Sequence, residues 1–267
     1  MTDYALRLSE DEIARYRLMA EHARARESDV WALAGIVAGA RVADVGCGPG
    51  ALLPALSEIV GPTGSVEAVD GDEDAVAAAS ALVTSSGLGN VSVSRARAEE
   101  TGLDPAGFDA VMIRHVLAHN GTTAQAIVRH LATLVRPGGC VFLVDVDMTM
   151  MRTRPELATF TEMRTKYGEF QVARGGAVQV GLHLDELLAG AGLELVSYTG
   201  VCDVAALPPG ARGPIWAARQ QMVADGIVSD ADVARWGADL DALGDAGTPL
   251  VAFAPRFLAV GRRPAAS

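Results

Sequence analysis

Five short apolar runs alternate with helical patterns between residues 41 and 146, and this alternation limits the chain to a few folds. The runs are predicted to be buried strands: Arg41–Val45, Ser65–Val69, Val91–Ser94, Phe108–Ile113 and Cys140–Val146. The helical patterns cover Ala51–Ile59, Asp72–Ser85 and Thr122–Val135. Strands that alternate with helices of this length imply right-handed βαβ crossovers and a largely parallel sheet. The predicted fold class is therefore α/β, with a doubly wound sheet.

The segments on either side of these strands are predicted to be mostly helical. Ser9 and Glu12 form a capping-box pattern before a helix over Asp11–Arg26, and a second short helix is predicted over Asp29–Val37. After Met148 the predicted elements are helices at Pro155–Val172 and Leu184–Ala191, a strand at Glu194–Thr199, two helices within Pro208–Gly244 and a last strand at Leu250–Val260. We expect one domain over residues 1–267, with a helical cap (1–38), a core (40–147) and two lid insertions (148–180 and 205–247).

The composition of the chain limits the kinds of partner it can bind and the cellular compartment it suits. Lys and Arg number 22 against 33 Asp and Glu, a net charge of −11 that argues against a nucleic-acid partner. The three cysteines form no CxxC pair, which fits a reducing compartment. The N-terminus lacks a signal-peptide pattern, and no apolar run approaches the length of a membrane span. We therefore expect a soluble, cytoplasmic protein without a membrane partner; a homodimer remains open.

The segment from Val42 to Gly50 is the most informative for function. It runs from a strand through a turn containing Gly46, Gly48 and Gly50 into a helix. The glycines permit positive φ and close approach of a ligand, and the following helix presents free N–H groups. Asp70, twenty residues further on, ends the next strand, where a carboxylate can accept hydrogen bonds from ribose hydroxyls. Both strand ends are therefore predicted to bind one nucleoside.

These residues resemble the class I S-adenosylmethionine-dependent methyltransferases of the small-molecule type. The matching pattern is an acid, one spacer and G-x-G-x-G, seen as Asp44 to Gly50, followed by Ala98-Glu99, Phe108-Asp109, Leu117–His119 and Leu134–Gly139. The resemblance implies a Rossmann-like sheet of seven strands in the order 3-2-1-4-5-7-6, and S-adenosylmethionine as cofactor. It implies cofactor contacts from Tyr16, Asp44, Gly46, Cys47, Gly48, Gly50, Asp70, Gly71, Arg97, Ala98 and Arg114. Arg97 departs from the pattern, since an acid often stands there, so recognition of adenine is expected to use backbone groups.

Two histidines are candidates for acid–base chemistry. His115 and His119 follow the fourth strand, at the carboxyl edge where ligands of open α/β sheets bind, and their spacing of four predicts one face of a helical turn. A base is needed only if the accepting atom must lose a proton, and His119 is preferred for that role. Asp145 and Asp147 lie near the fifth strand, but Arg114-His115 stand where a carboxylate would be needed, so no metal is expected.

The acceptor is predicted to be a small organic molecule, and a natural-product intermediate with an oxygen acceptor is the leading expectation. Apolar and Met-rich residues after the fifth strand and in the later insertion suit a lid over such a molecule: Met148, Met150, Met151, Phe160, Met163, Tyr167, Phe170, Trp216 and Met222. Other interpretations remain open at this point. They are a nicotinamide-dependent oxidoreductase, which shares the glycines and Asp70, an S-adenosylmethionine-binding enzyme that catalyses cyclisation or decarboxylation, and a non-catalytic binding module.

Overall fold

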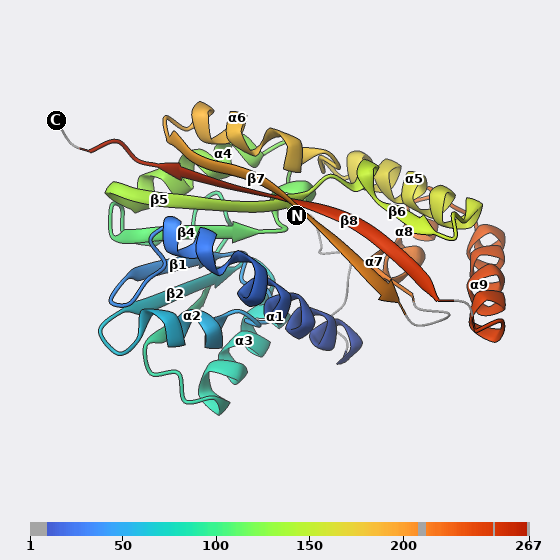
Figure 1. The fold of residues 1–267 in the computed structure, drawn as a ribbon, viewed down its shortest axis with the longest axis horizontal. Helices are drawn as coiled ribbons and strands as arrows, with labels where there is room; N and C mark the ends of the chain where they lie inside the picture. The colour runs from blue at the N-terminus through green and yellow to red at the C-terminus, as the bar shows by residue number, and fades with distance from the viewer. Residues whose placement is uncertain (1–9, 208–211, 248, 266–267) are drawn as a thin grey trace.

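The computed structural model describes residues 10–207, 212–247 and 249–265, and its centre is one twisted sheet (Figure 1). In these residues the sheet has eight strands. Seven of them follow the order β3-β2-β1-β4-β5-β8-β6. The eighth, β7, pairs with β8 along the edge opposite β5 and β6. The strands are β1 (Arg41–Val45), β2 (Ser65–Asp70), β3 (Val91–Arg95), β4 (Phe108–Arg114), β5 (Val135–Val146), β6 (Arg152–Arg154), β7 (Glu194–Leu207) and β8 (Leu250–Arg262). Strands β1 to β5 are parallel, and β8 is antiparallel to β5, β6 and β7.

The predicted fold class and strand order are confirmed, with one addition. The predicted sixth and seventh strands are β7 and β8, and β8 lies between β5 and β7 as expected. The sequence prediction missed β6, which pairs with Val251–Phe253 of β8. Three residues are too few to show an alternating pattern, so only the neighbouring strand reveals this element.

Helices cover both faces of the sheet. Successive side chains of a strand point to opposite faces, so apolar residues on both faces need a covering layer. Within β1, Ala43 and Val45 pack against α4 (Ala124–Leu134) and α6 (Leu184–Gly190). Val42 packs on the opposite side, with α1 (Glu10–Leu33), α2 (Leu53–Val60) and α3 (Glu73–Ser85). The central strands β1 and β4 are buried on both faces, whereas β3 at the edge of the sheet alternates Val with Ser and is half exposed.

The N-terminal segment is one helix, so the prediction of two separate helices is wrong. Helix α1 continues through residues 26–29 because no Gly or Pro interrupts it, and Trp31 Nε1 donates to Glu27 one turn earlier (3.4 Å). It ends before Gly35, which has a φ of 87°. The predicted capping residue Ser9 lies outside the described residues, as does the side chain of Glu12.

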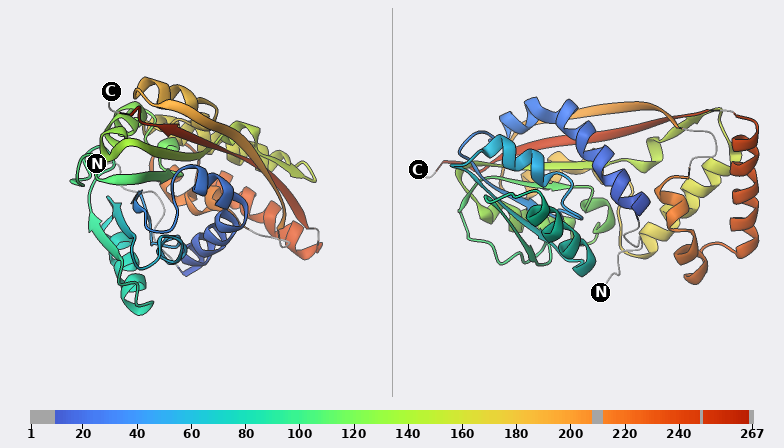
Figure 2. Two further views of the ribbon diagram at one scale, coloured as in Figure 1. Left: turned by 60° about the vertical axis from the view of Figure 1, so that its left-hand side comes forward. Right: turned by 90° about the horizontal axis from the view of Figure 1, so that it is seen from below.

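Strands β7 and β8 form a long antiparallel pair that extends beyond the sheet toward a group of helices (Figure 1; Figure 2, right). These helices are α5 (Ala158–Ala173), α7 (Pro214–Ala217), α8 (Arg219–Ala224) and α9 (Asp230–Asp245). They share their own apolar core, which includes Met163, Trp216 and Trp236. Within the described ranges, no helix has both the length and the apolar character needed to cross a bilayer.

Candidate active site

The glycine turn after β1 is held against β2 by backbone hydrogen bonds. Gly46 N and Cys47 N both donate to Val69 O, at 2.8 and 3.1 Å. Gly46 has a φ of 76°, and a Cβ there would lie 2.4 Å from Val116 Cγ2. Gly50 has a φ of 78°, and its Cβ would lie 2.9 Å from the Cβ of Ala79. Both positions therefore exclude any side chain, so this turn needs glycine at its first and last positions.

Asp70 connects the turn to the end of β2. Its Oδ2 accepts a hydrogen bond from Gly48 N (2.8 Å) and its Oδ1 accepts one from Asp72 N (2.9 Å). Asp72, and not Asp70, is the N-cap of α3, since it accepts from Ala75 N at 3.0 Å. Each carboxylate oxygen can accept a second hydrogen bond, so Asp70 can brace the loop and still accept from a ligand.

Asp44 is a buried carboxyl group at the end of β1, only 3% exposed. Burial raises the pKa of Asp44 to about 7; the nearby charge of Asp70 adds to this rise, and the guanidinium of Arg114 opposes it. A group that is destabilised as an anion in the unliganded protein gains most when a cation binds beside it. The site is therefore prepared for a positively charged ligand group.

Cys47 lies inside the turn and is no candidate nucleophile. Burial raises the pKa of its thiol well above the ordinary value, and the charges of Asp44 and Asp70 raise it further. The thiolate, which is the reactive form, is therefore disfavoured.

Helix α1 places Tyr16 over the glycine turn. A Cβ built on Gly48 would lie 3.6 Å from Tyr16 Cε1 and 3.8 Å from Cζ, so the ring is in contact distance of the loop backbone. Arg15 lies 4.9 Å from the centroid of this ring. The structure thus brings together Tyr16, Asp44, Asp70 and the glycine turn, which are far apart in the sequence.

Three other predicted cofactor contacts lie beside β2 and β3. Gly71 is exposed, and Ala98 packs at the margin of the core next to Val69 and Val45. Arg97 has an exposed side chain that pairs with Glu99 Oε1 at 3.0 Å. The guanidinium of Arg97 is therefore at the surface, and only its backbone remains available to the site.

His115 and His119 do not share a face of an α-helical turn, so this prediction is wrong. His115 has a φ of 56°, in the left-handed region, and its N–H donates to Val144 O (2.8 Å). A short 3-10 turn, η1 (Leu117–His119), follows it. His119 Nδ1 lies 3.3 Å from Oε1 of Gln171, a buried residue of α5. Burial lowers the pKa of both histidines, and the positive charge of Arg15 lowers both further.

The backbone joins the His119 loop to the end of the lid helix α5. Ala177 N donates to Ala118 O (2.8 Å), and Thr122 N donates to Gly175 O (3.0 Å). A Cβ on Gly176 would lie 2.8 Å from Ala118 O, so the two loops are in direct contact. The position of His119 is therefore tied to the lid.

The side chain of Arg114, one of the predicted cofactor contacts, is buried and forms an ion pair. Its Nη2 donates to Glu27 Oε1 at 2.9 Å, and Glu27 is 0% exposed. Arg256 of β8 lies 3.6 Å from the same oxygen and pairs with Asp203 of β7 at 2.6 Å. Sequence analysis missed Glu27, Arg256 and Asp203, since no local pattern indicates pairing between residues so far apart in the chain.

The lid residues predicted to face the acceptor are largely used for packing. Met163, Tyr167, Phe170, Trp216 and Met222 are buried in the lid's own core. Met148 packs at the margin of that core, and Met150 is 40% exposed. Most of these side chains therefore stabilise the lid and do not line a surface for the acceptor.

The two carboxylates considered as metal ligands are engaged by the backbone. Asp145 accepts from Ala118 N (3.0 Å) and from Val146 N (2.9 Å). Asp147 Oδ1 accepts from Thr149 N (2.8 Å) and from Thr149 Oγ1 (2.6 Å). Among the described residues no group of three or more His, Cys, Asp or Glu side chains is arranged to hold a metal ion.

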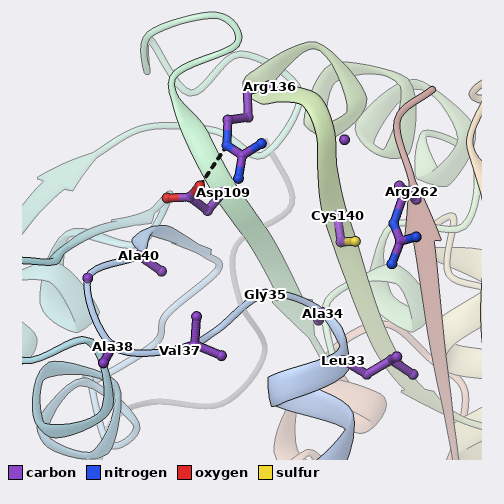
Figure 3. A pocket seen from close by; sticks show the side chains of 12 residues that line it. Leu33, Ala34, Gly35, Val37, Ala38, Ala40, Asp109, Arg136, Cys140 and Arg262 are labelled. Atoms are coloured by element: carbon purple, nitrogen blue, oxygen red, sulfur yellow. Dashed lines mark hydrogen bonds and ion pairs between the residues drawn. The ribbon is translucent and has the colours of Figure 1, made fainter. Parts of the chain in front are cut away.

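A hollow of about 330 Å³ lies at the opposite edge of the sheet (Figure 3). Its lining includes Asp109 and Cys140, near the beginnings of β4 and β5, and Arg136, whose Nε donates to Asp109 Oδ1 at 2.6 Å. Ligands of open α/β sheets bind at the carboxyl ends of the strands. This hollow is therefore separate from the candidate site.

Comparisons with known proteins agree with this geometry. A family model described as a methyltransferase domain matches residues 42–139. A ubiquinone/menaquinone biosynthesis C-methyltransferase of Pseudomonas putida is 31% identical over 114 residues, which are 42% of this chain and 44% of that protein. Nocamycin O-methyltransferase of Saccharothrix syringae is 35% identical over 105 residues, 39% of this chain and 37% of that protein. The chain thus matches less than half the length of either relative.

The fold is also found in solved structures. A SAM-dependent methyltransferase from Aquifex aeolicus superposes with a TM-score of 0.55 at 17% identity, covering 94% of this chain and 97% of that one. Residues 42–139 therefore match a methyltransferase-domain model, and the solved structures show that the fold is the one found in Rossmann-like S-adenosylmethionine-dependent methyltransferases. The matched relatives methylate carbon in one case and oxygen in the other by their names, so the comparisons leave the acceptor atom undecided.

Proposed function

We propose that this protein transfers a methyl group from S-adenosylmethionine to a small organic acceptor. The observation that supports this most is the placement of two buried or half-buried carboxylates, Asp44 and Asp70, on either side of a glycine turn that Tyr16 covers. A nicotinamide dinucleotide would bring its pyrophosphate to this turn, where a buried carboxyl such as Asp44 would be repelled. A sulfonium nucleoside brings positive charge instead.

The residues present fit this cofactor. Asp70 retains lone pairs for the ribose hydroxyls, and the backbone around Gly71 and Ala98 borders the adenine side, as the family resemblance implies. Asp44 and the loop backbone would hold the methionine end, with Tyr16 above it. When bound, the cofactor supplies a methyl group made electrophilic by its sulfonium. The protein's main task is then to orient the acceptor and exclude water.

Calorimetric titration with S-adenosylhomocysteine tests the proposal directly. We expect saturable binding of this demethylated product of the cofactor and none of NADH. Binding of NADH alone would select the oxidoreductase interpretation and overturn the proposal. If an acceptor is turned over, its mass must rise by about fourteen daltons, the mass of CH₂ by atomic composition, whereas cyclisation or decarboxylation would give a different mass.

His119 is the proposed base for an acceptor that must lose a proton, and Gln171 is the proposed positioning residue. If Nδ1–H of His119 donates to Gln171 Oε1, the lone pair of the ring lies on Nε2. Burial keeps the pKa of His119 below its ordinary value, so the ring is neutral and able to take a proton near pH 7. His115 is the weaker candidate, since its Nε2 is buried and has no hydrogen-bond partner.

His119→Gln is expected to lower turnover by roughly 10²- to 10⁴-fold while leaving affinity for S-adenosylhomocysteine nearly unchanged. Gln171→Glu should raise the pKa of His119, because an anion replaces a neutral acceptor, so the acid limb of the pH–rate profile should move to higher pH. Gln171→Leu should lower turnover without that shift. Val172 follows Gln171 in α5 and its side chain is exposed, so Val172→Ala serves as the matched control. Unchanged turnover in His119→Gln would remove this residue from the mechanism.

A further inference from the structure

A group of buried cationic side chains lies at the carboxyl ends of β4 and β5, where the antiparallel strand β8 passes. Arg114 ends β4, and Arg256 of β8 pairs in register with Val146, the last residue of β5. Both guanidinium groups approach one oxygen of Glu27, at 2.9 and 3.6 Å. This shared partner means that Arg114 and Arg256 come close to each other, although 142 residues separate them in the chain.

Several buried nitrogen atoms in this group lack hydrogen-bond partners. Arg114 Nε, Arg256 Nε and His115 Nε2 are buried, and none of them makes a hydrogen bond. Both arginine side chains are only 8% exposed. Buried donors without acceptors are rare in native proteins, and each raises the question of what satisfies it. Because arginine N–H groups only donate, the missing partner must be an acceptor.

The charges around these donors favour an anionic acceptor group. Arg15, Arg114 and Arg256 all face His115, and their positive charges add to burial in keeping that ring neutral. Glu27 pairs with both Arg114 and Arg256, and Asp203 pairs with Arg256. These pairings leave the Nε atoms of both arginines without an acceptor, and an anionic oxygen gains the most from two neighbouring guanidinium groups.

Sheet topology places the backbone of Arg256 on the lid side of the sheet. The residues proposed to hold the cofactor lie on β1, β2 and the loop after β3, whereas β8 is three strands from β1 on the other side of β4 and β5. Neighbouring strands are about 4.8 Å apart, so this separation is roughly 14 Å. The lid also joins the sheet on this side, through β6 and η2 (Met148–Met150). Arg256 is therefore on the side where an acceptor would enter.

From these observations, and given the methyl transfer proposed above, we infer that Arg256, Arg114 and His115 bind an ionised acidic oxygen of the acceptor. The acceptor class would be phenols, enols or carboxylic acids bound as anions. Guanidinium groups match such oxygens in geometry and charge. The same oxyanion could accept the methyl group itself or, in a phenolate or enolate, activate a neighbouring carbon. The inference therefore fits both oxygen and carbon methylation.

The test uses the whole chain saturated with S-adenosylhomocysteine and two probes of similar shape. The first probe is 4-nitrophenol, used at a pH where its acidic oxygen is ionised. The second probe, nitrobenzene, lacks this oxygen. Absorbance and calorimetry measure the binding of each probe. We expect nitrophenolate to bind at least about tenfold more tightly, a difference of roughly 1.4 kcal/mol. Arg256→Lys keeps the positive charge but loses the paired N–H donors of the guanidinium. It should remove most of the preference for nitrophenolate over nitrobenzene. Arg262→Lys, near the far end of the same strand, is the matched control.

Asp203→Asn provides a second variant in case Arg256→Lys does not fold. It keeps both arginines and removes the carboxylate that competes for Arg256, so nitrophenolate should bind several-fold more tightly than to the wild type.

Equal affinity for the two probes, or no binding of nitrophenolate at millimolar concentration, would overturn the inference. Weaker binding of S-adenosylhomocysteine by Arg256→Lys, with the probe preference intact, would assign the guanidinium to the cofactor's carboxylate and also overturn it. Failure of the wild type to bind S-adenosylhomocysteine would instead reject the proposed function.

Discussion

Asp44→Asn is expected to reduce affinity for S-adenosylhomocysteine by roughly a hundredfold, while making the unliganded protein more stable at pH 8. The loss follows because a hydrogen-bonded charge contributes about 1.5–3 kcal/mol to an interaction. The gain follows because Asp44 is buried, and burial raises its pKa to about 7. At pH 8 the wild type must keep this carboxylate ionised away from water, and an amide avoids that penalty.

The pH dependence of both effects has a defined sign. Between about pH 4 and 7 the folded wild type binds a proton at Asp44 that the unfolded chain releases, so this group makes stability fall as pH rises through that window. Ligand affinity should behave in the opposite way, rising by up to about tenfold per pH unit below 7, because the ammonium group of the ligand favours the ionised carboxylate of Asp44. Asp44→Asn should lose both dependences.

Calorimetric titration and thermal unfolding at pH 6, 7 and 8 measure these effects. Asp109→Asn is a suitable control, because this strand carboxylate lies at the opposite edge of the sheet and accepts from Arg41 N (2.8 Å) and from Arg136. It is expected to change stability without changing ligand affinity. Wild-type affinity in Asp44→Asn would contradict the assignment of Asp44 to the methionine end of the cofactor.

Glu27→Gln is expected to destabilise the protein by about 3–5 kcal/mol, the usual cost of breaking a buried ion pair by removing one partner. Glu27 is fully buried, and its oxygens contact Arg114, Arg256 and Trp31. Glutamine has nearly the same shape but no charge, so it leaves two guanidinium groups buried without their shared carboxylate. For a chain of this size the melting temperature should fall by roughly 6–15 °C.

The same helix offers a matched control. Arg24 of α1 pairs with Glu58 of α2 at 2.7 Å, but both side chains are exposed. Glu58→Gln should therefore leave the melting temperature nearly unchanged, since exposed ion pairs contribute little. Equal shifts for Glu27→Gln and Glu58→Gln would show that the buried carboxylate does not hold the arginine pair. Thermal unfolding followed by circular dichroism measures both variants.

The resemblance to a known family implied the order of the sheet, whereas the sequence by itself determined the α/β class and the position of the glycine turn. These features depend on local patterns: apolar runs of strand length, helical periodicity between them, and glycines where a side chain cannot fit, as at Gly46 beside Val116. Asp44 and Asp70 could be identified because each ends a predicted strand, and the ends of neighbouring parallel strands meet at one edge of the sheet.

Only the tertiary structure decided which distant side chains share the site and which fill a core. The contact of Glu27 with Arg114 and Arg256 joins α1, β4 and β8, and that of His119 with Gln171 joins a loop to the lid. No local pattern encodes such pairs, because their energies depend on burial and on approach in three dimensions. For the same reason the Met and aromatic residues of the lid could not be assigned from sequence. An apolar stripe looks alike whether it faces a ligand or, as for Met163 and Trp216, another helix.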